Sequence, residues 1–138
     1  MSAVWVRLRV GEEQYSLPVE DVLEIADVGT PRGVPGAPAC VLGVVNRHGQ
    51  VLPVIDLARV ISGIAEGQGK CLVVVEAAGL RAGVTVDEVL DVGPAAALSA
   101  APESELLSGA AMVDGAWVGM LDTGVLLSAG SASASGRA

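Results

Sequence analysis

The side chains that could do chemistry are few and lie far apart in the sequence. The only histidine, His48, lies in the polar segment Arg47-His48-Gly49-Gln50, and the two cysteines, Cys40 and Cys71, lie in apolar segments. Cys40 and His48 could in principle act as a nucleophile and its base. However, Cys40 lies in the apolar run Pro38–Leu42, where a cysteine behaves as a small buried hydrophobic residue. We therefore expect no catalytic residues.

Metal and phosphate chemistry are not indicated either. A metal site needs several His, Cys or carboxylate ligands at a suitable spacing, and this sequence offers none. Gly67-Gln68-Gly69-Lys70 lacks the GxxxxGK[ST] spacing of a phosphate loop. Asp56 and Asp122 could form a carboxylate pair, but they recur at equivalent places in a repeat, which favours a structural turn or cap. We expect a protein that is not an enzyme and needs no cofactor.

The composition limits the partners further. The chain has 138 residues, 51% of them hydrophobic, and a formal net charge of −8. This length predicts one domain, or two very small ones that share a core. The excess of acidic residues disfavours nucleic acid and anionic lipid as partners. No segment reaches the roughly 20 apolar residues that span a bilayer, and two cysteines without CxxC spacing do not suggest secretion. We expect a cytoplasmic protein with no direct membrane insertion.

The spacing of apolar residues predicts an all-β fold. Apolar and polar residues alternate over Val4–Val10, and a second apolar run over Tyr15–Val19 follows the polar turn 11–14. This pattern predicts a β-hairpin. Leu42–Asn46 and Val51–Leu57 predict another hairpin around Arg47-His48-Gly49-Gln50. Further strands are expected on both sides of residues 78–81.

An internal repeat organises these strands. Val19–Ile25 returns as Val86–Val92, and Gly43–Ile61 returns as Gly109–Leu127. Short strands that occur twice suggest two small barrels built from one duplicated unit. We place the first barrel at about residues 1–62 and the second at about 70–128. Residues 129–138 have the composition of a flexible C-terminal tail.

Several motifs in the same order resemble the CheW family, the adaptors of bacterial chemotaxis. They cover roughly Val4 to Leu127, and several short motifs that agree in register are more specific than one. The segments that carry the resemblance are Leu17–Ile25, Pro35–Pro38, Leu42–Asn46, Val51–Leu57 and Val86–Val89. The resemblance implies two five-stranded, SH3-like β-barrels around one shared core.

The resemblance also implies the partners and the partner-binding residues. In the CheW family, one barrel face meets the CheW-like regulatory domain of the histidine kinase CheA, and a groove between the barrels accepts the cytoplasmic tip of a chemoreceptor. Val22 and Gly43 correspond to positions that line the groove, although core packing is an equally good interpretation of both. The remaining expected partner-binding residues are Glu24, Asn46, Arg47 and His48.

The hairpin departs from the family pattern Asn-Leu-Arg-Gly, because this sequence has Asn46-Arg47-His48-Gly49. His48 therefore takes the place of the family's arginine, with Glu24 as the nearest plausible acid. Imidazole lacks the five donors of guanidinium. Neighbouring strand residues point to opposite faces, so we expect Arg47 not to replace the missing arginine without a change in the turn. Either the chain binds a partner of different shape, or the turn has shifted register. We expect an adaptor between chemoreceptors and CheA, or, as the alternative, a divergent CheW-like module that serves another signalling kinase outside chemotaxis.

Overall fold

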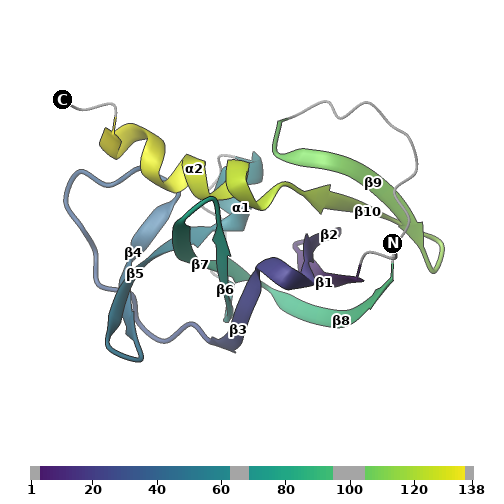
Figure 1. Ribbon diagram of the computed structural model, residues 1–138, viewed down its shortest axis with the longest axis horizontal. Coiled ribbons are helices and arrows are strands. Elements are labelled where there is room, and N and C mark those ends of the chain that lie inside the picture. The colour runs from purple at the N-terminus through teal and green to yellow at the C-terminus, as the bar shows by residue number, and fades with distance from the viewer. Residues whose placement is uncertain (1–3, 63–68, 95–104, 136–138) are drawn as a thin grey trace.

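The computed structural model describes residues 4–62, 69–94 and 105–135, which consist mainly of β-strands (Figure 1). The first half contains β1 (Val4–Val10), β2 (Glu13–Pro18), the 3-10 turn η1 (Val19–Asp21), β3 (Val22–Asp27), β4 (Val41–Arg47), β5 (Gln50–Asp56) and α1 (Leu57–Ser62). The second half contains β6 (Cys71–Ala77), β7 (Leu80–Val86), β8 (Glu88–Pro94), β9 (Leu107–Val113), β10 (Ala116–Leu121) and α2 (Thr123–Ser135). Within the described residues, neither α-helix is long and apolar enough to cross a membrane.

The strands form two five-stranded sheets, as the resemblance to the CheW family implies. The first sheet has the order β8-β1-β2-β10-β9 and the second β3-β6-β7-β5-β4. Neighbouring strands are antiparallel, except that β10 runs parallel to β2 and β5 runs parallel to β7. Each strand of one sheet therefore has an equivalent in the other, and every equivalent pair joins an element of the first repeat to one of the second. This correspondence agrees with an internal duplication.

The division of the chain between the two sheets differs from the predicted barrels at 1–62 and 70–128. The first sheet takes β1 and β2 from the first half and β8, β9 and β10 from the second. The second sheet takes β3, β4 and β5 from the first half and β6 and β7 from the second. The two repeats thus exchange their last three strands. Because the repeats offer equivalent strands, the sequence pattern fits pairing within a repeat as well as pairing between repeats.

One apolar core joins the two sheets, as expected. The buried residues Val6, Leu8 and Leu17 from the first sheet belong to the same cluster as Val75 and Val84 from the second. Each sheet directs apolar side chains toward the other, so the contacts between the two sheets bury both apolar faces. A smaller buried cluster, on strands β5 and β6 of the second sheet, consists of Leu52, Val54, Leu72 and Val74. That cluster lies beneath the candidate site described below.

Helix α2 corrects the expectation of a flexible tail at 129–138. It begins after Asp122 and continues to Ser135, so residues 129–135 are helical, whereas 136–138 lie outside the described residues. Leu126 and Leu127 are buried in the shared core. The carbonyl of Ala129 accepts a hydrogen bond from Sγ of Cys40 at 3.6 Å. Composition alone suggested a linker, but the buried leucines anchor a helix that the small residues then continue.

Candidate partner-binding site

A two-residue turn closes the hairpin between β4 and β5. Arg47 pairs with Gln50, so only His48 and Gly49 form the loop. Both have left-handed backbone, with φ of 54° and 82°, as in a type I′ turn whose twist matches the flanking strands. The side-chain oxygen of Asn46 accepts a hydrogen bond from the backbone N–H of Gly49 at 3.0 Å. The turn therefore holds the imidazole of His48 at the tip of the hairpin.

The carboxylate of Glu24, on β3, contacts both side chains at this end of the hairpin. Arg47 donates from Nη2 to Oε2 at 2.6 Å and from Nε to Oε1 at 3.3 Å. Nε2 of His48 lies 3.0 Å from the same Oε2. A guanidinium that bonds a carboxylate through two nitrogens fixes the geometry of both groups. We call Glu24, Arg47 and His48 the Glu24 cluster.

The cluster keeps Glu24 ionised. Hydrogen bonds from Arg47 and then from His48 lower the pKa of Glu24 to about 2, and the bond to Glu24 raises the pKa of Arg47. The Glu24 side chain is 28% exposed and that of His48 is 76% exposed. Because water screens such pairs, they contribute little to stability. The effect of the cluster is to hold one negative and one positive charge at fixed positions on the surface.

The Glu24 cluster also links the two edges of the second sheet. Strands β3 and β4 are at opposite ends of its strand order, so the contact between Glu24 and Arg47 joins them through side chains. A backbone bridge supports it, since Arg32 and Val44 exchange two hydrogen bonds of 2.9 Å. The sheet therefore curls until its edges meet, and both edges supply residues to the site.

A hollow of about 370 Å³ lies at the cluster, with the buried side chains of Leu52 and Val74 among its lining. Arg81 also lines it, donating from Nη1 to Oε1 of Gln50 at 2.6 Å and from Nη2 to Oε2 of Glu76 at 2.7 Å. Sequence reasoning placed Arg81 in a turn and missed it. The available signal was the opposite charge of Glu76 and Arg81, which lie symmetrically around a two-residue turn and pair across strands.

Strand β3 exposes apolar side chains beside this charged cluster. Leu23 and Ile25 are 49% and 46% exposed, whereas Glu24 between them points toward the hairpin. The strand thus reverses the usual pattern of apolar residues inside and polar residues outside. Exposed apolar residues next to fixed charges are typical of surfaces that bind other proteins. Together with the curled sheet, this arrangement is suited to binding rather than to catalysis.

Two of the expected site residues lie away from the cluster. Val22, at the start of β3, is half-buried and packs against the shared core. Gly43 is buried, and a Cβ atom on it would lie 2.3 Å from the backbone oxygen of Arg32. Gly43 therefore permits the close approach of the segment that bridges to Val44. The structure brings together Glu24, Arg47 and His48, with Asn46 beside them.

The sequence of this chain matches that of a known protein family. A model of the CheW-like domain family matches residues 5–131, almost the whole chain. The chain belongs to the CheW-like domain family. A solved CheW structure from Thermoanaerobacter tengcongensis, described as a scaffolding protein, agrees in fold. Its TM-score is 0.79 at 27% identity, and the match covers 88% of this chain and 85% of that one.

Two relatives of this CheW-like chain show the extent of the similarity. The chemotaxis protein CheW of Rhizobium meliloti is 35% identical over 89 residues, which is 63% of this chain and 57% of that protein. The protein FrzA of Myxococcus xanthus is 41% identical over 54 residues, 39% of this chain and 34% of FrzA. The matched parts thus span from about a third to just over half of these relatives.

The expected orientation of Arg47 in this CheW-like hairpin is wrong. Strand alternation predicted that Arg47 and His48 would point to opposite faces, yet both contact Glu24. The reason is that strand β4 ends at Arg47 and His48 has the left-handed conformation of the turn. Alternation applies only to extended residues. Arg47 therefore reaches Glu24 from the position where the CheW pattern has leucine.

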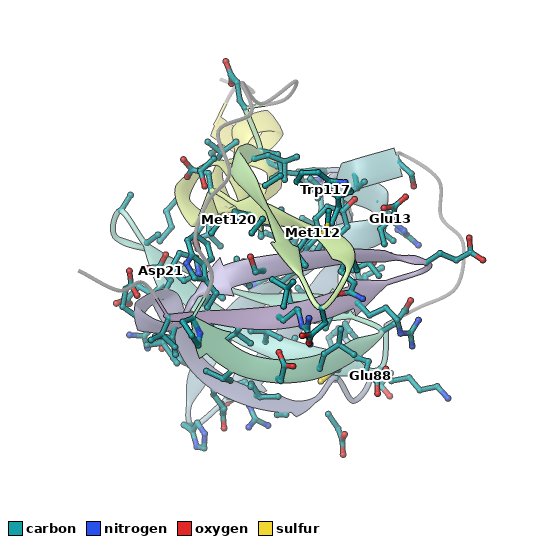
Figure 2. All side chains as sticks on the ribbon, turned by 90° about the vertical axis from the view of Figure 1, so that its right-hand side faces the viewer. Glu13, Asp21, Glu88, Met112, Trp117 and Met120 are labelled. Atoms are coloured by element: carbon teal, nitrogen blue, oxygen red, sulfur yellow. The ribbon has the colours of Figure 1, made fainter. Side chains whose placement is uncertain are left out.

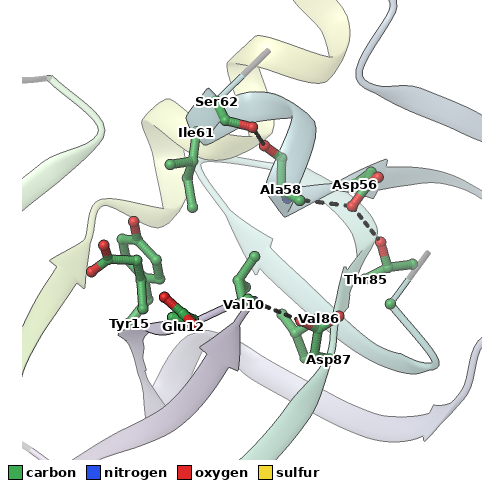
Figure 3. Close-up of a pocket in the computed structure, with 13 residues that line it drawn as sticks. Val10, Glu12, Tyr15, Asp56, Ala58, Ile61, Ser62, Thr85, Val86 and Asp87 are labelled. Atoms are coloured by element: carbon green, nitrogen blue, oxygen red, sulfur yellow. Dashed lines mark hydrogen bonds between the residues drawn. The ribbon is translucent and has the colours of Figure 1, made fainter. Parts of the chain in front are cut away.

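The other candidate residues of the CheW-like chain have structural roles. Cys40 and His48 flank opposite ends of β4, so they form no catalytic pair, and burial raises the pKa of the Cys40 thiol. Asp56 accepts a hydrogen bond from the backbone of Ala58 at 3.3 Å, at the start of α1 (Figure 3). Asp122 accepts one from Val125 at 3.1 Å, at the start of α2. The recurring aspartates therefore cap the two helices, which agrees with the predicted structural turn or cap.

Acid is expected to remove the contribution of Glu24 to stability. Its pKa in the folded chain is about 2, against an ordinary value of 4.5. A group with a lowered folded pKa stabilises the fold above its unfolded pKa and loses that effect as the pH falls. Thermal melting should show a constant difference between the wild-type chain and Glu24→Gln above about pH 5, and a shrinking difference from there to about pH 2. A difference that grows in acid would contradict this assignment.

Proposed function

We propose that this CheW-like chain is a non-enzymatic cytoplasmic adaptor that couples chemoreceptors to a CheA-type histidine kinase. The observation that carries the proposal is the fixed Glu24 cluster beside the exposed apolar residues Leu23 and Ile25. The family gives this surface its context, since one relative is named a chemotaxis protein and another a scaffolding protein. Affinity would come from burying the small aliphatic side chains, and specificity from the charges next to them.

We infer separate tasks for the residues of the site. Leu23 and Ile25 offer apolar area to the receptor tip. Arg47 holds Glu24 in place through two bonds, so that the carboxylate does not turn toward solvent. His48, at the exposed tip, is free to offer a ring nitrogen to the partner as well as to Glu24. Val22 packs against the shared core, and Gly43 permits the close backbone approach of Arg32.

The alternative function is a CheW-like module for another signalling kinase outside chemotaxis. The observation that favours it is the hairpin sequence Arg47-His48, because a histidine at the tip has fewer donors than an arginine. A receptor that relies on a guanidinium at this position would bind less tightly. Binding of the chain to a standard receptor tip therefore separates the two functions.

Changes in the Glu24 cluster should alter binding to a receptor tip in opposite directions. His48→Arg should strengthen binding about five-fold, on the order of 1 kcal/mol, because it offers charge-assisted bonds at the partly exposed interface. Glu24→Gln should remove most of that gain. Arg47→Leu should weaken binding about five-fold, because Glu24 loses its two-pronged partner. Calorimetric titration of each variant measures these effects.

Arg9→Leu supplies the control for charge in that titration. Arg9 lies on the first sheet and pairs with Asp87 and Glu88, so its loss changes the net charge but leaves the Glu24 cluster intact. We expect receptor affinity to stay within about two-fold of the wild type. Equal losses in Arg9→Leu and Arg47→Leu would mean that net charge, and not the cluster, determines binding.

Binding to the kinase tests the proposal as a whole. The chain should bind the CheW-like regulatory domain of a co-encoded kinase with a Kd in roughly the micromolar range of transient signalling contacts. Calorimetry and co-elution measure this binding. The absence of binding to every kinase of this type in the genome would refute the kinase part of the proposal.

A further inference from the structure

The duplicated fold places a second hairpin at the position equivalent to β4–β5. This is the hairpin of β9 and β10, whose turn residues Asp114 and Gly115 have φ of 50° and 81°. They match His48 and Gly49, which have φ of 54° and 82°. The second hairpin therefore has the same turn, but an acidic residue takes the place of the histidine.

Trp117 and Met112 form an exposed apolar pair on this hairpin. They are directly opposite each other on β10 and β9, and they are 59% and 45% exposed. The acid Glu13 lies beside Trp117, because the next residues, Gln14 and Val118, are paired. Figure 2 shows Met112, Trp117 and Glu13 close to this hairpin. An aromatic side chain that remains so exposed is a frequent centre of protein interfaces.

Two carboxylates lie near this pair. The Asp114 side chain is 85% exposed and forms an ion pair with Nη2 of Arg7 at 3.6 Å. Arg7 also binds Asp91, to which it donates hydrogen bonds from both Nε and Nη2. Asp114, although paired with Arg7, and Glu13 thus place two carboxylates near Trp117. A partner with positive charges would be attracted both to these carboxylates and to the face of the indole ring.

The apolar surface continues along the same face of the first sheet. Two residues beyond Trp117, Gly119 is paired with Tyr15. Tyr15 is part of the lining of an apolar hollow of about 310 Å³, together with Ile61, Leu107 and Val125. An exposed tryptophan next to an apolar hollow suits a partner that brings aliphatic side chains as well as cations.

We propose that Glu13, Met112, Asp114 and Trp117, which we call the hairpin surface, bind a basic amphipathic segment of another protein. Its Lys or Arg side chains would meet Asp114, Glu13 and the indole, and its aliphatic side chains would cover Met112. A symmetric contact between two copies of the chain would bring equal acidic groups together, which is unfavourable. This surface is separate from the Glu24 cluster, and the inference does not depend on the proposed function.

A synthetic amphipathic peptide of leucine and arginine, and a matched peptide with glutamate in place of arginine, test the proposal. Fluorescence anisotropy of the labelled peptides against the full chain should show binding of the arginine peptide alone. Trp117→Ala should weaken the binding of the arginine peptide at least about ten-fold, and Asp114→Asn should weaken it about three-fold. Val51→Ala is the control, since Val51 takes the equivalent place on the other hairpin and is 63% exposed. It should change affinity less than about two-fold.

Charge reversal sharpens the test. A chain with Glu13→Lys and Asp114→Lys should prefer the glutamate peptide, while circular dichroism shows an unchanged fold. Four outcomes would overturn the proposal: no binding of the arginine peptide, equal losses in Trp117→Ala and Val51→Ala, unchanged preference after charge reversal, or a dimer of the chain that Trp117→Ala dissolves.

Discussion

Gly43→Ala is expected to lower the free energy of unfolding by about 3 kcal/mol. Two effects combine at this position. The backbone φ of Gly43 is 150°, a conformation that residues with a Cβ rarely adopt. In addition, a Cβ would lie 2.3 Å from the backbone oxygen of Arg32, which cannot move away without breaking its hydrogen bond to Val44. The substitution therefore separates the segment after β3 from β4.

Urea denaturation of Gly43→Ala, with Gly33→Ala as control, measures this effect. Gly33 is the residue next to Arg32, and no atom lies within 4 Å of a Cβ placed on it. The control should thus stay within about 0.5 kcal/mol of the wild type. If both variants lose the same stability, the close approach at Gly43 does not support the fold. A loss confined to Gly43→Ala would mean that weakened partner binding in that variant reflects packing and not direct contact.

Leu126→Ala is expected to lower the free energy of unfolding by a similar amount, about 3 kcal/mol. Leu126 is fully buried in the shared core, although it lies on the last helix of the chain. Removing its side chain leaves a cavity between α2 and the sheets, because packed neighbours relax only in part. The same variant should also loosen the rest of α2, including the contact between Cys40 and the carbonyl of Ala129.

Ser128→Ala, on the exposed side of the same helix, is the control for Leu126→Ala. Its free energy of unfolding should lie within about 0.5 kcal/mol of the wild-type value, because substitutions at exposed positions rarely change stability by more. Denaturation in urea and hydrogen exchange of the α2 amides measure both the global and the local effect. A cost below about 1 kcal/mol for Leu126→Ala would contradict a docked α2 and would restore the expectation of a flexible C-terminal end.

Local patterns predicted the strands and turns well. Alternation in Val4–Val10 and the Gly-bearing turn at Gly49 identify hairpins because the side-chain period of a strand and the left-handed turn are local properties. The repeat likewise predicted two small equivalent barrels, and the recurrence of Asp56 and Asp122 predicted a structural turn or cap in each. Each of these inferences depends only on neighbouring residues or on comparison of the two halves.

Long-range features could not be predicted in the same way. The exchange of strands between repeats depends on which of two equivalent partners a strand meets, and the pattern of residues is the same for both. The contact between Arg47 and Glu24 depends on the curl of the sheet that brings β3 to β4. Arg81 joins the site only because β7 lies between these edges. The partner-binding roles of Val22, Glu24, Gly43, Asn46, Arg47 and His48 stay predictions for the binding titrations.

The most direct test of the adaptor function is whether the chain joins its two proposed partners. A chemoreceptor tip is immobilised, and the CheW-like domain of the co-encoded kinase is passed over it with and without the chain. The account predicts that the tip retains the kinase domain only when the chain is present, and less of it with Arg47→Leu. Equal retention without the chain, or none in its presence, would contradict the account.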